Sequence, residues 1–162
     1  MLLLWIPIAV LVLFYLTLRD LRVRQLPNHC VALYALLFLP YAWLGGLDLQ
    51  QVGSHLLVAA LSFGVLFALF LLGAMGGGDV KLGTAVFLWA GSALAFPVLI
   101  IVAWTGGLVA VAGWLADRRV VRRITWRPVS CMQYALSAQR GVPYGVALAA
   151  GGLFVLWRAW NM

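Results

Sequence analysis

Long apolar runs, separated by short basic stretches, constrain the fold of this chain more than any other feature. Apolar residues make up 65% of the sequence and charged residues only 9%, whereas soluble domains contain about 45–50% and about 25%. A membrane span takes about 20 mostly apolar residues when it is an α-helix. We therefore expect residues 1–162 to form a single, all-α, polytopic membrane domain.

The runs predict six transmembrane helices, of which the fourth is short. Residues 84–116 are mostly apolar and must hold two of these helices. Two full crossings with a turn need about 40 residues, so one helix of this pair does not clear the bilayer. We place the short helix close to Asp79 and the break after it near residues 91–97. The other four helices are expected at residues 2–18, 29–44, 55–75 and 142–157.

Positive charge predicts the orientation of these helices. Ten of the eleven Lys and Arg residues lie in three places beside apolar runs, namely residues 19–24, Lys81 and residues 118–140. Basic loops of membrane proteins face the cytoplasm. We therefore expect a basic cytoplasmic loop at residues 117–140 and both termini outside, in the periplasm. Membrane lipid accounts for the net charge of +7 better than nucleic acid does, and we expect no nucleic-acid partner.

Acidic residues are scarce, so any acid chemistry depends on very few side chains. The chain contains no Glu and only Asp20, Asp48, Asp79 and Asp117. In the expected topology Asp20 and Asp79 each lie at the cytoplasmic end of a span, while Asp48 lies on the opposite side. An ionisable residue within a membrane segment is a candidate functional group. Two carboxylates that meet there would share one proton and could activate water against a peptide carbonyl.

The position of each aspartate on its helix suggests a division of roles. Asp79 lies near a predicted helix N-terminus, which favours the anion, whereas Asp20 lies at a predicted C-terminus. As a hypothesis, Asp79 is the ionised base and Asp20 the protonated partner. Three glycines precede Asp79 at residues 76–78, and their missing Cβ atoms leave room for another chain beside the backbone. The Cys and His residues do not have the spacing of a zinc site.

Three segments carry a resemblance to a known family. Residues 76–81, Gly-Gly-Gly-Asp-Val-Lys, resemble the GxGD motif of the intramembrane aspartyl proteases. Asp20 followed by Pro27 and Asn28 resembles the first-aspartate segment of the prepilin (type IV leader) peptidases. Residues 142–145, Val-Pro-Tyr-Gly, resemble the opening of the last span of that family. The matches come in family order and extend over nearly the whole chain.

The resemblance implies an aspartyl endopeptidase of the bacterial inner membrane. It would cleave the leader from prepilin-like substrates at the cytoplasmic face, with Asp20 and Asp79 as the catalytic pair. Larger family members also carry a methyltransferase domain with paired CxxC motifs. No CxxC exists here, so the chain resembles the minimal form found with tight-adherence (Flp-type) pili, and this resemblance implies that neither metal nor cofactor is required. The substrate-binding or site-shaping residues implied are Gly76, Gly78, Lys81, Pro27, Asn28, Pro143 and Tyr144.

Two other functions compete with the peptidase. In a small proton- or cation-coupled transporter, Asp20 and Asp79 would bind a cation or relay protons. A non-catalytic subunit of a pilus-assembly machine would use neither carboxylate for chemistry. Exchange of each aspartate for asparagine separates these functions, because only the peptidase loses leader removal.

Overall fold

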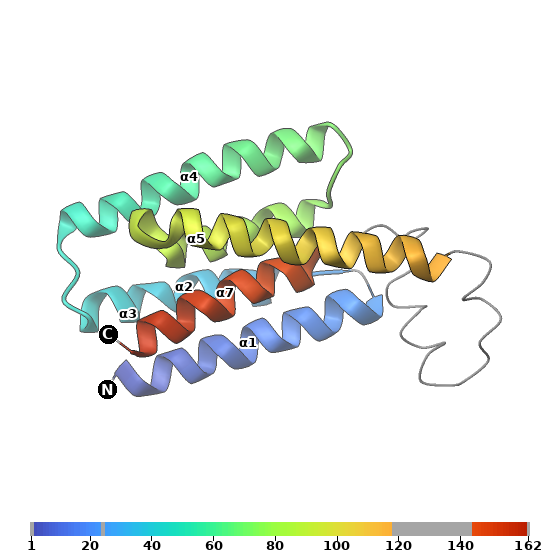
Figure 1. The fold of residues 1–162 in the computed structure, drawn as a ribbon. Helices are drawn as coiled ribbons and strands as arrows, with labels where there is room; N and C mark the ends of the chain where they lie inside the picture. Colours follow the sequence, from blue (N-terminus) through green and yellow to red (C-terminus); the bar gives the residue numbers. More distant parts are fainter. Residues whose placement is uncertain (1, 24, 118–143, 162) are drawn as a thin grey trace.

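The computed structural model describes residues 2–23, 25–117 and 144–161, and in this part of the chain every regular element is an α-helix. The helices run roughly along one direction as a bundle, and the two ends of the described chain lie together at one end of it (Figure 1). The all-α prediction is confirmed for these residues. The helices are α1 (Leu2–Val23), α2 (Asn28–Leu36), α3 (Phe38–Leu44), α4 (Leu49–Leu71), α5 (Gly77–Asp117) and α7 (Tyr144–Trp160).

The prediction of six separate helices is wrong for the described residues. When α2 and α3 are taken together, these residues form five continuous helical segments. Helices α2 and α3 make up one apolar stretch, Asn28–Leu44, interrupted only at Leu37. The predicted fourth and fifth helices are both contained in α5, because a single residue with non-helical geometry, Gly91, replaces the loop expected between them. Figure 1 shows the chain turning back within α5, so that a shorter first arm and a longer second arm run in opposite directions.

Gly91 makes this reversal possible. Its φ of 58° lies in the left-handed region that glycine adopts readily. A Cβ atom at this position would also lie 2.5 Å from the His55 ring. The break therefore occurs at the first residue of the predicted interval 91–97, and Pro97 lies inside the second arm.

His55 of α4 supports the end of the first arm. Its Nδ1 atom lies 2.7 Å from the carbonyl oxygen of Leu88. The last carbonyls of a helix have no partner within the helix, and a carbonyl oxygen can only accept, so Nδ1 is the protonated nitrogen of this pair. The His55 ring also packs against the Phe38 ring at a centroid distance of 5.0 Å.

Helix α4 begins earlier than the predicted residue 55, because Asp48 and Gln51 form a capping box. The Gln51 N–H donates to the Asp48 carboxylate at 2.6 Å, and the Asp48 N–H donates to the Gln51 side chain at 2.9 Å. This reciprocal pair satisfies two backbone donors at a helix N-terminus. Asp48 is thus a structural residue at the end of the bundle remote from Asp20 and Asp79.

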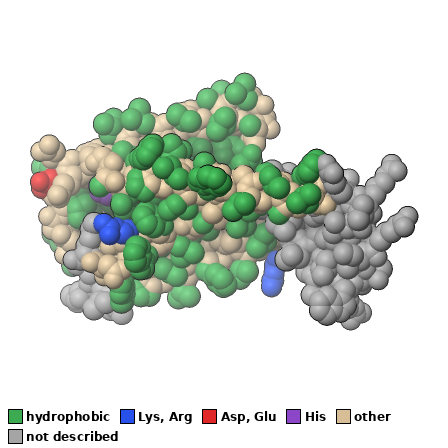
Figure 2. Space-filling model, in the orientation of Figure 1, with side chains coloured by type: hydrophobic (Ala, Val, Ile, Leu, Met, Phe, Trp, Pro, Cys, Tyr) green, Lys and Arg blue, Asp and Glu red, His purple; other side chains and the backbone are tan. Residues whose placement is uncertain are grey.

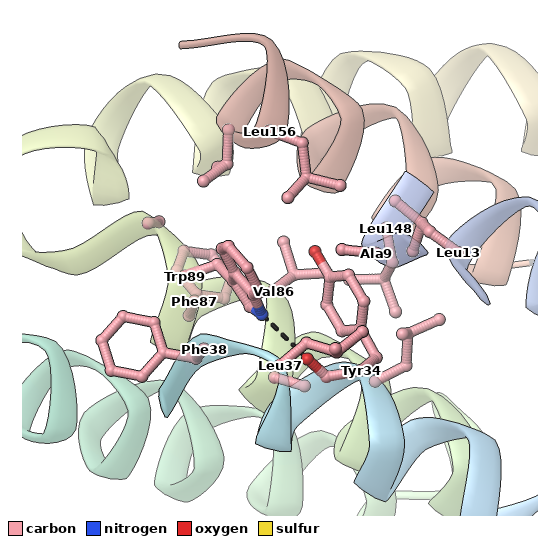
Figure 3. Close-up of a cluster of buried hydrophobic side chains, with 14 of the residues drawn as sticks. Ala9, Leu13, Tyr34, Leu37, Phe38, Val86, Phe87, Trp89, Leu148 and Leu156 are labelled. Atoms are coloured by element: carbon pink, nitrogen blue, oxygen red, sulfur yellow. Dashed lines mark hydrogen bonds between the residues drawn. The ribbon is translucent and has the colours of Figure 1, made fainter. Parts of the chain in front are cut away.

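The first arm of α5 lies in the middle of the core. Trp89 of this arm donates its indole N–H to the Tyr34 carbonyl oxygen at 2.9 Å, and the two rings stack at 5.8 Å (Figure 3). Val86 of the same arm is also fully buried, as are Leu13 of α1 and Tyr34 of α2. Helices α2, α4 and α7 contact α5, and α1 contacts α2 and α7. The segment that begins with Asp79 is therefore held on several sides.

Much of the outer surface is apolar. Ala59 is the only residue among those described in α4 that is buried, and hydrophobic side chains cover much of the described surface in Figure 2. Helix α4 and the Gly77–Leu115 part of α5 are long and apolar enough to cross a membrane. Apolar surface of this extent is typical of a protein whose surroundings are lipid.

Candidate active site

Asp20 lies near the end of α1 and is the buried acidic residue among those described, with 5% of its surface exposed. One carboxylate oxygen accepts a hydrogen bond from the backbone N–H of Gly145 at 3.1 Å. Gly145 is in the first turn of α7, where backbone N–H groups have no partner within the helix. The end of α1 therefore meets the beginning of α7 through a carboxylate.

This contact removes the argument on which the expected proton assignment rested. The predicted protonation of Asp20 relied on its place at a helix C-terminus. In the structure, the N-terminus of α7 also faces this carboxylate, and such a site favours an anion. The positions of the two aspartates on their helices therefore do not distinguish an acid from a base.

Gly145 has to be a glycine for the contact to form. A Cβ atom on this residue would lie 2.5 Å from the Asp20 oxygen and 2.7 Å from its carboxylate carbon. Real Cβ atoms do not approach other atoms so closely. Gly145 is absent from the site residues predicted from sequence, although the segment at residues 142–145 pointed to this region.

Asp79 lies in the first turn of α5 and is half-buried. The Gly76 N–H donates to its carboxylate at 3.3 Å, and the Asp79 N–H donates back to the Gly76 carbonyl at 3.0 Å. A Cβ atom on Gly76 would lie 3.1 Å from that carboxylate, and one on Gly78 would lie 3.1 Å from the Leu26 side chain. The glycine turn thus holds Asp79 and allows the segment between α1 and α2 to pass close to it.

The two aspartates line the same cavity. It has a volume of about 390 Å³ and lies at the end of the bundle where α1 ends and α5 begins. Three separate segments of the chain form its wall, so residues far apart in sequence meet here. The lining residues are Asp20, Gln25, Leu26, Asn28, Gly76, Gly77, Gly78 and Asp79.

The sequence model of the type IV leader peptidase family matches residues 7–111. This range contains both aspartates and the glycine turn. The chain belongs to the type IV leader peptidase family. No curated protein and no solved structure matches it.

Membership of the type IV leader peptidase family makes the chain a peptidase of a membrane-associated family. That conclusion agrees with the two helices long and apolar enough to cross a membrane. The described residues contain no group of three His, Cys, Asp or Glu that could hold a metal ion. Two carboxyl groups that line one cavity can carry out acid–base hydrolysis, in which one group accepts a proton and the other donates one.

Of the predicted site residues Lys81 and Asn28, Asn28 lines the aspartate cavity and Lys81 contacts Asn28 beside it. The Lys81 ammonium donates to the Asn28 side-chain oxygen at 2.9 Å, which joins the first turns of α5 and α2. Pro27 does not line the cavity. It precedes α2 with φ −63° and ψ 125°, and its carbonyl accepts the N–H groups of Cys30 and Val31.

The remaining predicted residues lie at the beginning of α7. Tyr144 is the first residue of this helix and is half-buried. Pro143 and the basic loop at residues 118–140 fall outside the described residues. Sequence reasoning missed Gln25 and Leu26 as cavity residues, because neither carries a distinctive chemical signal in a chain so rich in apolar residues.

Proposed function

We propose that this protein is an aspartyl endopeptidase of the bacterial inner membrane that removes the leader peptide of type IV, Flp-type prepilins at the cytoplasmic face. The observation that carries the proposal is the shared cavity of Asp20 and Asp79 in a chain of the type IV leader peptidase family. Asp48, by comparison, caps a helix at the other end of the bundle. The GxGD character of the site follows from Gly76 directly before α5 and from Gly78 and Asp79 in its first turn.

Cleavage requires one carboxylate and one carboxylic acid. The carboxylate accepts a proton from a water molecule, whose oxygen attacks the scissile carbonyl carbon. The carboxylic acid hydrogen-bonds to the carbonyl oxygen and donates its proton as the tetrahedral intermediate forms. The proton taken from water then passes to the leaving amine. As the C–N bond breaks and the carbonyl reforms, the other carboxylate takes back a proton from a hydroxyl of the intermediate, which restores one proton to the pair. Two carboxyl groups that share a proton titrate as a pair, so either residue can begin as the acid.

The cytoplasmic assignment rests on charge. The exposed Arg22 and Lys81 lie at the aspartate end of the bundle, whereas Arg158 is near the end of α7, where the termini lie. Basic residues gather on the cytoplasmic side of membrane proteins. Both termini would then be periplasmic, and the bundle would cross the membrane several times as one domain.

Processing of a co-expressed prepilin tests the proposal. Asp20→Asn and Asp79→Asn should each leave the precursor at its unprocessed size on a gel, while both variants still insert into the membrane. Asp48→Asn is the matched control, because asparagine also caps helices well. It should process the precursor normally. Normal processing by the first two variants would contradict the peptidase and would favour a transporter or a non-catalytic assembly subunit.

A further inference from the structure

We propose that an apolar groove beside the aspartate cavity binds the apolar helix of the substrate, the segment that follows the scissile bond. We call it the α2–α5 groove, after the two helices that supply most of its wall, and α4 supplies the rest. The inference rests on the proposed function and adds to it the place where the membrane-embedded part of the substrate is held. The groove has a volume of about 320 Å³ and is lined by Asn28, Ala32, Ala35, Ala59, Lys81 and Leu88, among others.

The groove adjoins the aspartate cavity. Asn28 lines both spaces. Its side chain accepts the hydrogen bond from Lys81, which lines the groove and lies two positions after Asp79. A chain that leaves the aspartate cavity past this polar pair therefore enters the groove directly.

The lining residues show which way the groove runs. On α2 they are Asn28, Val31, Ala32 and Ala35, and their spacing of three, four and seven positions places them on one face of the helix.

On α5 the lining residues Lys81, Thr84, Ala85 and Leu88 repeat the same spacing. Each set begins at its polar residue and continues for about two turns, or roughly 10 Å. The groove thus starts at the aspartates and extends along the bundle, and beyond the polar pair its wall is almost entirely apolar.

A helix from another protein fits the chemistry of this space. Helix α4 forms one side of the groove through Leu56 and Ala59, and Leu56 is 56% exposed, so the groove is accessible from outside on this side. Within a hydrocarbon layer a peptide segment must be helical, since no water can satisfy its backbone. Small side chains such as Ala32 and Ala59 let a second helix approach closely. An occupant with an extended junction and then an apolar helix would place the junction at the aspartates and the helix in the groove.

Another apolar groove lies elsewhere and supplies a control. It has a volume of about 380 Å³ and is formed on the second arm of α5 by Ala103, Trp104, Gly107, Leu108 and Val111. None of these residues lines the aspartate cavity. Ala32 and Ala103 are both exposed alanines in apolar grooves, so the same substitution can be made at each without disturbing the core.

Cleavage of two substrates by Ala32→Phe and Ala103→Phe tests the inference. One substrate is the full-length precursor in lipid, and the other is a short peptide across the leader junction without the apolar helix. Ala32→Phe should lower kcat/KM for the full-length precursor about tenfold or more, chiefly through KM, and leave the peptide within about twofold of wild type. Ala103→Phe should change neither. An unchanged rate on the precursor, or an equal loss on both substrates, would overturn the proposal.

A binding measurement separates failure of the groove from failure of the proposed chemistry. A photo-reactive benzoylphenylalanine replaces Leu56 of the α2–α5 groove or Leu108 of the control groove in the Asp79→Asn protein, and the sample is illuminated with the full-length precursor; both leucines are large and exposed. Crosslinks from position 56, traced to the apolar helix of the precursor, are expected, and none from position 108. Equal crosslinking at both positions, or none at position 56, would refute the groove even if both aspartates proved essential for cleavage.

Discussion

Asp20 accepts a hydrogen bond at 3.1 Å from the backbone N–H of Gly145, a residue 125 positions later in the chain. The contact joins the end of α1 to the beginning of α7, and it fixes one of the two carboxylates of the aspartate cavity. Asp79 is held separately, by Gly76 in its own turn. Each carboxylate is therefore positioned by a backbone N–H of a glycine, and each of those glycines is a place where a methyl group can disturb the site.

Gly145→Ala should inactivate the protein with little effect on its assembly in the membrane. The added Cβ would lie 2.5 Å from the Asp20 carboxylate, so the carboxylate has to move, and misplacement of about 1 Å in an active site lowers rates about 10²-fold. Leader removal by purified protein measures the effect. Gly64→Ala is the control, because nothing lies within 4 Å of a Cβ there, and it should retain full activity. Activity near wild type in Gly145→Ala would show that the contact does not position Asp20.

Gly91→Ala should lower the free energy of unfolding by about 1–3 kcal/mol. A non-glycine residue is strained at the φ of 58° found here, and its Cβ would also meet the His55 ring at 2.5 Å. Thermal unfolding in detergent measures the change. An unchanged melting temperature would mean that the reversal of α5 does not depend on glycine at this position.

His55→Leu should destabilise the protein by about 1–3 kcal/mol, because the partly buried Leu88 carbonyl loses its side-chain donor. His55→Gln, which keeps a donor group, should lose less. Both variants should keep a near-normal kcat/KM for leader removal at temperatures where they are folded, since His55 lies at the opposite end of the bundle from the aspartates. A leucine variant as stable as wild type would contradict the capping role.

Lys81 and Asn28 should be energetically coupled. Their hydrogen bond at 2.9 Å involves a charged donor, and such bonds contribute about 1.5–3 kcal/mol when both partners are well placed, less at an exposed site. A double-mutant cycle with Lys81→Met and Asn28→Ala, read from unfolding in detergent, measures the coupling. Strictly additive effects of the two substitutions would show that the bond does not hold α2 against α5.

The sequence predicts the most useful feature of the site, which is that Asp20 and Asp79 lie at the same end of the bundle. The prediction works because basic stretches orient membrane segments and because the chain has so few acids. The predicted break near Gly91 is also confirmed. The sequence does not predict that the break is a one-residue reversal, because this reversal depends on His55, which contacts the end of the first arm from a different helix.

Two features were missed for different reasons. The early start of α4 could have been predicted, since Asp48 and Gln51 have the spacing of a capping box. The absence of Lys and Arg from that stretch was instead interpreted as the mark of an outside loop. The role of Gly145, by contrast, could not be predicted from the sequence. A glycine needed for close approach looks like any other glycine until its neighbour from α1 is known, and this chain contains 17 of them.

The most direct test of the central claim is the rate of leader cleavage by purified Asp20→Asn, Asp79→Asn and the double variant, each in lipid bilayers with a full-length precursor. If the two carboxylates act as one unit, each single change should lower kcat by about 10²–10⁴-fold, and the double variant should be no slower than the slower single one. Near-normal cleavage by either single variant, or losses that multiply in the double variant, would contradict a shared role for Asp20 and Asp79.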